Sequence, residues 1–152
     1  MSNYFKWDTG LSSDIGARVY NNAAIEIADS VATALTFNSE RWDTAAMHSV
    51  SSATNQLVCK VAGTYLIGCN VRWEANASGV RDVGIRLNGS TYITRVYMSA
   101  GASINHMQSL STVYDLAVND YVEVIVGQNS GGPLDVQSNA NYSPEFWIQK
   151  LA

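Results

Sequence analysis

The chain has 152 residues, a length that suits one domain with its own hydrophobic core. Apolar residues make up 47% and charged residues only 14%, against about a quarter in ordinary soluble domains, so we expect something besides water to cover part of the surface. The net charge of −4, with nine scattered basic residues, excludes a stripe that neutralises phosphates, and no apolar run is long enough for a membrane-spanning helix. We therefore expect neither nucleic acid nor a membrane as a partner.

Residues 1–14 form an N-terminal arm ahead of the first predicted strand and contain an aromatic cluster of Tyr4, Phe5 and Trp7. Aromatic residues in a terminal segment indicate that something covers them. Two interpretations stay open: the cluster plugs the core of its own subunit, or it docks on another protein. The opening residues lack the basic and apolar parts of a secretory signal, so we expect the chain to be made in a cytoplasm.

Segments in which every second residue is apolar follow one another along the rest of the chain. No segment carries a sustained helical repeat, and residues 41–50 could form one short turn at most. The pattern predicts an all-β sandwich or barrel-like roll. The predicted strands are residues 17–27, 32–37, 55–61, 63–73, 80–87, 91–98, 110–118, 121–127 and 144–151.

The strand predicted at residues 63–73 is long and regular, with one exception. Its large apolar residues share one face, and Leu66 alone adds an apolar residue to the other face. We interpret Leu66 as pointing away from the sandwich core, where a neighbouring subunit could cover it. Cys59 and Cys69 are too few for a disulfide scaffold, and we expect two buried free thiols rather than a bridge.

The connections between the predicted strands differ in length in a regular way. If successive strands from residue 55 onward are antiparallel, alternate connections lie at the same end of the molecule. The tight connections, around residues 62–63, 88–90 and 118–120, then share one end with the C-terminus. The long connections share the other end: residues 75–79, 99–105 and 128–142.

The last predicted strand is apolar on both faces, with Phe146 and Ile148 on one and Trp147 and Leu151 on the other. Such a strand is buried on both faces, either inside a monomer or with one face against another subunit. The low charge fraction favours a subunit interface, since obligate interfaces resemble a domain core cut in half. Leu66, Trp147 and Leu151 are therefore the candidate interface residues.

Five motifs resemble, in order and spacing, those of the C1q/TNF-like jelly-roll family over residues 17–152. The segments that carry the resemblance are Leu35-Thr36-Phe37 with Trp42-Asp43 and Asn55-Gln56-Leu57-Val58-Cys59, Gly63-x-Tyr65-x-Ile67-x-Cys69-x-Val71, Ile85-Arg86-Leu87-Asn88-Gly89, residues 113–122, and Glu145-Phe146-Trp147-Ile148. Asn119 replaces the family's usual glycine before Asp120, a change that asparagine tolerates because it accepts left-handed backbone.

The resemblance implies an antiparallel β-sandwich jelly roll over residues 15–152 that assembles as a compact homotrimer, with one sheet of each subunit facing the three-fold axis. The chain has no collagen stalk, and its WDTxxMH and NYSPEFW segments resemble small stalkless proteins of tailed-bacteriophage virions. These differences argue against a complement or cytokine function.

No sequence motif indicates catalysis. His48 and His106 are expected on connections, without Cys, Asp or Glu at metal-ligand spacing. Asp115, Asp120 and Glu123 are expected at turns and edges, where they accept backbone N–H groups rather than bind calcium. We expect no catalytic residue, cofactor or metal.

From these observations we expect a phage virion protein, specifically a trimeric capsid decoration or cement protein made in the bacterial cytoplasm. Its partners would be its own copies and the major capsid protein or another virion protein, gripped by the N-terminal arm. The alternative is the receptor-binding tip of a phage tail or fibre, whose long connections would contact a host glycan or protein near Tyr142. A bacterial C1q-like adhesin or lectin is disfavoured by the missing secretory signal.

Overall fold

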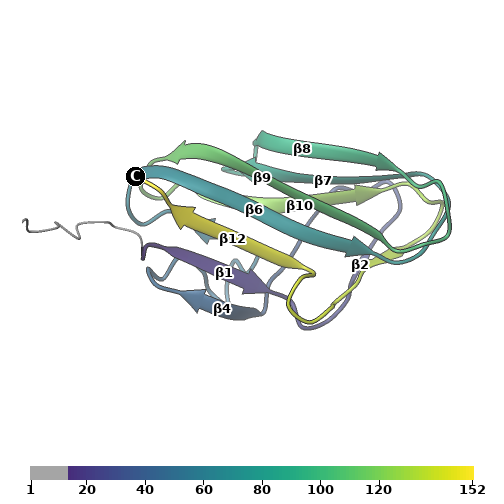
Figure 1. The fold of residues 1–152 in the computed structure, drawn as a ribbon, viewed down its shortest axis with the longest axis horizontal. Coiled ribbons are helices and arrows are strands. Elements are labelled where there is room, and N and C mark those ends of the chain that lie inside the picture. Colours follow the sequence, from purple (N-terminus) through teal and green to yellow (C-terminus); the bar gives the residue numbers. More distant parts are fainter. Residues whose placement is uncertain (1–13) are drawn as a thin grey trace, which may run out of the picture.

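A computed structural model describes residues 14–152 as a sandwich of two antiparallel β-sheets (Figure 1). The part of the chain described contains no helix, and therefore none that could cross a membrane. The strands are β1 (Gly16–Tyr20), β2 (Ile25–Ile27), β3 (Thr33–Ala34), β4 (Ser39–Asp43), β5 (Leu57–Val58), β6 (Gly63–Trp73), β7 (Val80–Leu87), β8 (Thr91–Ser99), β9 (His106–Leu116), β10 (Tyr121–Gln128), β11 (Leu134–Val136) and β12 (Glu145–Lys150).

The first sheet has the order β2-β11-β6-β12-β1-β4, and β9 pairs with β6 as well. Strand β9 follows β6 along its whole length, from the pair Gly63 and Leu116 to the pair Trp73 and His106. The second sheet has the order β3-β10-β7-β8, and β5 also pairs with β10. The all-β antiparallel sandwich predicted from the sequence is confirmed.

The core lies between the two sheets and is filled by the alternate residues of their strands. On β6, Tyr65, Ile67, Cys69, Val71 and Trp73 are all fully buried, as the sequence pattern predicts. They pack with buried residues of the other strands in one cluster, among them Val19, Phe37, Val83, Ile85, Val122, Val124, Val126, Phe146 and Ile148.

The two cysteines are buried free thiols, so that prediction is confirmed. Burial raises the pKa of the Cys69 thiol well above its usual range, because the charged thiolate would lose its hydration. A neutral, unreactive Cys69 therefore acts as a small apolar residue of the core.

The two ends of the sandwich differ as the connection lengths predict. At the tight end, the N–H of Thr64 donates to the carbonyl of Ala152 at 2.9 Å, and the N–H of Asn119 donates to the carbonyl of Cys59 at 2.9 Å. Asn119 has a positive φ of 73°, the left-handed conformation expected of it. The long connections lie at the opposite end, on the right in Figure 1.

Several strands differ from the sequence prediction, and residues 32–37 and 55–61 form only the two-residue strands β3 and β5. Residues 39–43 form β4, an edge strand, where at most a turn was expected, because its exposed side chains hide the alternation. The segment 17–27 divides into β1 and β2, since the Asn21 side chain accepts from the N–H of Ala23 and turns the chain. Residues 134–136 form β11 inside a predicted connection, and β9 begins at residue 106 rather than 110.

Two predicted connection or turn residues lie in strands instead. His106 begins β9, where it is buried with its ring Nε2 3.3 Å from the carbonyl oxygen of Ala102. Glu123 lies in the middle of β10 and is 4% exposed, because Arg86 of β7 approaches its carboxylate at 3.1 Å and the Asn55 amide donates to it. Asp120 does behave as predicted and accepts from the N–H of Ala117 at 2.8 Å.

Candidate subunit interface

The outward face of the first sheet carries the candidate interface residues. Each strand of the sandwich turns alternate side chains away from the core. One row of residues on this face crosses five strands in register: Trp42 of β4, Arg18 of β1, Trp147 of β12, Gly68 of β6 and Ser111 of β9. We call this surface the outward face.

Trp147 lies directly against Gly68 on the outward face. A β-carbon at Gly68 would lie 2.6 Å from Cε2 of the Trp147 indole, closer than real atoms approach. The φ of Gly68 is not positive, so the backbone does not require a glycine there. A glycine inside a strand often marks a place where another group approaches closely. The lack of a side chain at Gly68 therefore lets the indole pack directly against the sheet.

Leu66 and Val113 continue the apolar surface in the next row of the outward face. They are directly paired across β6 and β9, and Gln149 of β12 lies on the other side of Leu66. Leu66 is half-buried, whereas Val113 is 55% exposed. Leu151 follows the end of β12 and is 53% exposed. All three residues proposed from the sequence thus lie on or beside this face, and their role as an interface stays a prediction.

The sequence analysis missed three further apolar residues on the outward face: Trp42, Met107 and Val113. They are 39%, 45% and 55% exposed. Trp42 was missed because β4 was not predicted. Met107 lies before the strand predicted at residues 110–118, and Val113 stands between Ser111 and Asp115 on the outward side of β9, so the predicted strand looked polar on that side. The register of β9 on β6 was the signal that could have found them.

A charged cluster lies beside the apolar surface. Glu145 of β12 is 1% exposed, because its carboxylate accepts from Arg18 Nε at 2.6 Å and from Arg41 Nη2 at 2.7 Å. The Arg41 guanidinium lies 3.9 Å from the centre of the Tyr20 ring, and that of Arg18 lies 5.2 Å from the Trp147 ring. The outward face therefore presents an Arg- and aromatic-rich surface, the composition that is enriched at protein interfaces.

The candidate docking residues Tyr4, Phe5 and Trp7 lie outside the described residues, which begin at residue 14. The division into an arm of residues 1–14 and a domain of residues 15–152 stays a prediction. Strand β1, at Gly16–Tyr20, is the first element of the sandwich.

The histidines and acidic residues do not gather around a common point. Among residues 14–152, no three His, Cys, Asp or Glu side chains come together in a way that could hold a metal ion. His48 is held by its own neighbourhood, with Nδ1 3.0 Å from Glu40 Oε1 and Nε2 3.2 Å from the carbonyl oxygen of Thr54. The expected absence of a catalytic or metal site stays a prediction.

Comparison with known proteins places the fold but not the family. No family model and no curated protein matches the sequence. Among solved structures, an Eiger TNF protein from S. frugiperda superposes with a TM-score of 0.70 at 12% identity, covering 92% of this chain and 94% of that one. Murine APRIL gives 0.67 at 14% identity, over 90% of this chain and 98% of that one.

The globular domain of a zebrafish complement 1qA protein also superposes, with a TM-score of 0.61 at 16% identity over 89% of this chain and 93% of that one. Identities this low establish the fold alone. The chain has the jelly-roll fold of TNF and C1q-like domains, as its sequence motifs imply.

Proposed function

We propose that the chain is a non-enzymatic structural protein that assembles as a homotrimer through the outward face of the first sheet. The observation that carries this proposal is the packing of the Trp147 indole on Gly68, beside the exposed Val113. Contiguous apolar surface of this kind on a soluble domain marks an interaction site. The C1q/TNF-like resemblance supports a trimer, because it implies that one sheet of each subunit faces the three-fold axis.

The Glu145 cluster would suit such an interface. In a single subunit, Arg18 and Arg41 already neutralise Glu145, so assembly would not bury an unpaired carboxylate. Both arginines stay about one third exposed, at 34% and 29% of the side chain. Their remaining N–H groups are thus available to carbonyl or hydroxyl oxygens of a neighbouring subunit.

We further propose that the trimer decorates the head of a phage virion as a cement protein. Support comes from the phage-like sequence segments and the aromatic N-terminal arm. Burial of apolar area gives about 2.5 kcal/mol per 100 Å2, so modest contacts repeated over many copies would stabilise a shell against internal pressure. Tyr4, Phe5 and Trp7 would supply such contacts to the major capsid protein.

The oligomeric state is tested first, by light scattering after size exclusion and by native mass spectrometry. The expected mass is three times the 16.5 kDa of the chain. A stable monomer at micromolar and higher concentration would contradict the trimer.

Electron microscopy of the particle tests the location. Many copies on the head would support decoration, whereas a few copies at the tail would overturn it and favour the receptor-binding alternative. Deletion of residues 1–14 should abolish docking on the particle while the trimer still forms. Docking that survives the deletion would rule out the arm.

A further inference from the structure

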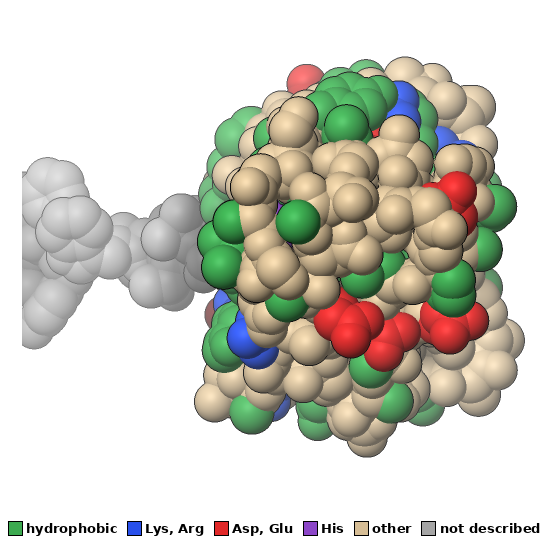
Figure 2. All heavy atoms as spheres, turned by 90° about the vertical axis from the view of Figure 1, so that its right-hand side faces the viewer, with side chains coloured by type: hydrophobic (Ala, Val, Ile, Leu, Met, Phe, Trp, Pro, Cys, Tyr) green, Lys and Arg blue, Asp and Glu red, His purple; other side chains and the backbone are tan. Residues whose placement is uncertain are grey.

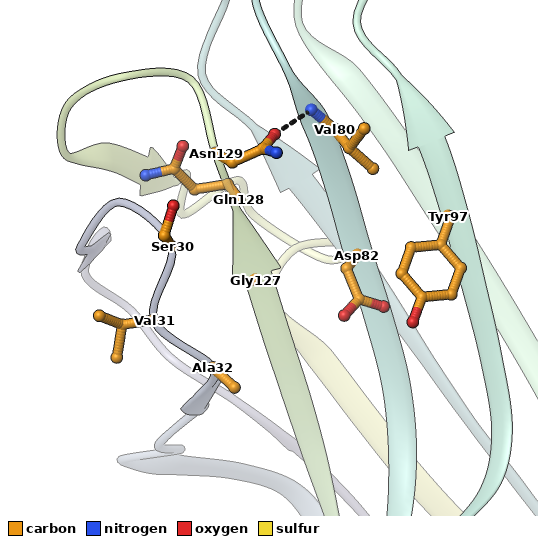
Figure 3. Close-up of a pocket in the computed structure, with 9 residues that line it drawn as sticks. All are labelled: Ser30, Val31, Ala32, Val80, Asp82, Tyr97, Gly127, Gln128 and Asn129. Carbon is orange, nitrogen blue, oxygen red and sulfur yellow. Dashed lines mark hydrogen bonds between the residues drawn. The ribbon is translucent and has the colours of Figure 1, made fainter.

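A hollow of about 290 Å3 opens on the outward side of the second sheet, at the end that carries the long connections (Figure 3). One wall is the segment of Ser30, Val31 and Ala32, between β2 and β3. The opposite wall is Asp82 of β7 and Tyr97 of β8, and Figure 3 shows Gly127 of β10 between the two walls. The hollow lies on the opposite side of the sandwich from the outward face of the first sheet.

Gly127 leaves the floor of the hollow bare. Its φ is not positive, so the backbone does not require a glycine. A β-carbon there would meet nothing closer than Asp82 Oδ2 at 3.6 Å, which is ordinary contact. The next outward-facing glycine on the sheet, Gly84, is different, because the Tyr92 ring covers it at 2.8 Å. An uncovered glycine inside a strand costs about 0.5–1 kcal/mol relative to alanine and is typical of a place where a ligand approaches the backbone.

The hollow offers an aromatic ring that is held in place. Tyr97 is 60% exposed, and the guanidinium of Arg95 lies 4.8 Å from the centre of its ring. Arg95 is itself fixed, because it lies 4.3 Å from the Tyr92 ring and donates from Nε to Asp82 at 2.9 Å. One side of the Tyr97 ring is therefore occupied by Arg95, and the rest of the ring is open.

Polar groups without a partner lie around this ring. In the described part of the chain, neither the Tyr97 hydroxyl nor the Asn129 side-chain N–H group makes a hydrogen bond, although the Asn129 oxygen is fixed by the N–H of Val80 at 2.6 Å. The Asp82 carboxylate is neutralised by Arg95 and keeps lone pairs that can accept from a hydroxyl. The groups that face the hollow are thus a hydroxyl, an amide donor and a neutralised acceptor.

The backbone around the hollow is already paired. Gly127 pairs with Asp82 of β7, and the carbonyl of Gln128 accepts from the N–H of Ser30 at 2.7 Å. The Gln128 amide donates to the carbonyls of Ile27 and Gly132, at 3.0 and 2.8 Å. A peptide strand therefore finds no unpaired backbone on the floor of the hollow, and a ligand seated there would be recognised through side chains.

We propose that this hollow binds one ring of a neutral saccharide. A sugar ring presents C–H bonds with partial positive charge on one face, which suit the negative face of Tyr97. Its hydroxyl groups suit the Asn129 donor and the Asp82 acceptor, and the methyl groups of Val31 and Ala32 contact its other side. The volume of the hollow, about 290 Å3, is at the lower limit for ligand-binding pockets, which suits one ring rather than several.

The end of the molecule that faces the viewer in Figure 2 carries a group of acidic side chains across its lower half and few basic ones, so it offers little to attract an anionic ligand. The site differs from the one suggested by the sequence alone, since Tyr142 does not line the hollow. The proposal depends neither on trimer formation nor on a place in a virion.

Saturation-transfer NMR on the full chain tests the proposal, with the methyl glycosides of glucose, galactose, mannose, N-acetylglucosamine and rhamnose as probes. At least one should bind the unchanged protein. Tyr97→Ala removes the ring, and Gly127→Val fills the floor; each should weaken binding about tenfold or more. Tyr142→Ala is the matched control, because Tyr142 is 41% exposed and lies outside the hollow.

The proposal is supported if both hollow variants lose binding while the control retains it. It is overturned if none of the five glycosides binds, if Tyr97→Ala binds as well as the unchanged protein, or if only Tyr142→Ala loses binding. Circular dichroism establishes that each variant is folded. If Gly127→Val fails to fold, Tyr97→Ala, a change at an exposed side chain, decides alone.

Discussion

Val113→Asp is the change that separates assembly from folding most cleanly. Val113 is 55% exposed on the outward face, so a single folded subunit scarcely depends on its side chain. In the proposed trimer the same side chain would be covered by a neighbour. The substitution should therefore dissociate the trimer and leave the subunit folded.

The size of the effect follows from the exposure. Complete burial of a valine side chain is worth about 1.5 kcal/mol, so covering the exposed half of Val113 contributes about 0.8 kcal/mol per subunit. Placing a carboxylate in a covered interface costs at least about 1 kcal/mol more. The loss is about 2 kcal/mol per subunit and about 6 kcal/mol per trimer, which is roughly 10⁴-fold in the association constant. The concentration at half assembly should then rise about 100-fold, since that constant scales with its square.

Sedimentation velocity over a dilution series measures this shift, and urea unfolding at the lowest concentration reports on the subunit. Val50→Asp is the matched control, because Val50 is 52% exposed and lies in the connection between β4 and β5, outside the strands of the outward face. Leu66→Asp, opposite Val113, should weaken the trimer in the same direction. If Val113→Asp and Val50→Asp assemble at the same concentration as the unchanged chain, the outward face is not the interface.

Three further predictions concern the subunit. Gly68→Ala should lower Tm, because the added β-carbon displaces the Trp147 indole. Gly127→Ala, by contrast, should leave stability unchanged or raise it by about 0.5 kcal/mol. Equal effects of the two changes would contradict the close packing of Trp147 on Gly68. Glu145→Ala leaves two arginines without their carboxylate and should cost about 3 kcal/mol in urea unfolding, and a loss below about 1 kcal/mol would show that the cluster adds little. Burial raises the pKa of Cys69, so the folded thiol keeps its proton while the unfolded thiol ionises above its usual pKa of about 8.5. The stability that this thiol contributes is therefore complete below that pH. Above it, the free energy of unfolding falls by up to about 1.4 kcal/mol per pH unit. Cys69→Ala should flatten the decline of Tm between about pH 8 and pH 10, and an unchanged decline would refute this cause.

The sequence by itself determined the sheet-forming character of the chain and the composition of its core. The alternation from Gly63 to Trp73 identifies β6 and its buried face, because side chains of a strand point alternately to its two sides. Asn119 identifies a tight turn, since asparagine accepts the positive φ of 73° found there. These properties are local, and each can be read within a few residues.

Only the tertiary structure decided which surfaces are completed by residues far apart in the chain. Glu145 is buried by Arg18 and Arg41, which lie 127 and 104 residues away, and no local pattern signals that pairing. Strand β4 is exposed at an edge and has no buried alternation, so its place is decided by pairing with β1. The sugar-sized hollow likewise depends on Gly127, Asp82 and Tyr97 lying in one row across three strands, because register, and not sequence spacing, decides which side chains share a face.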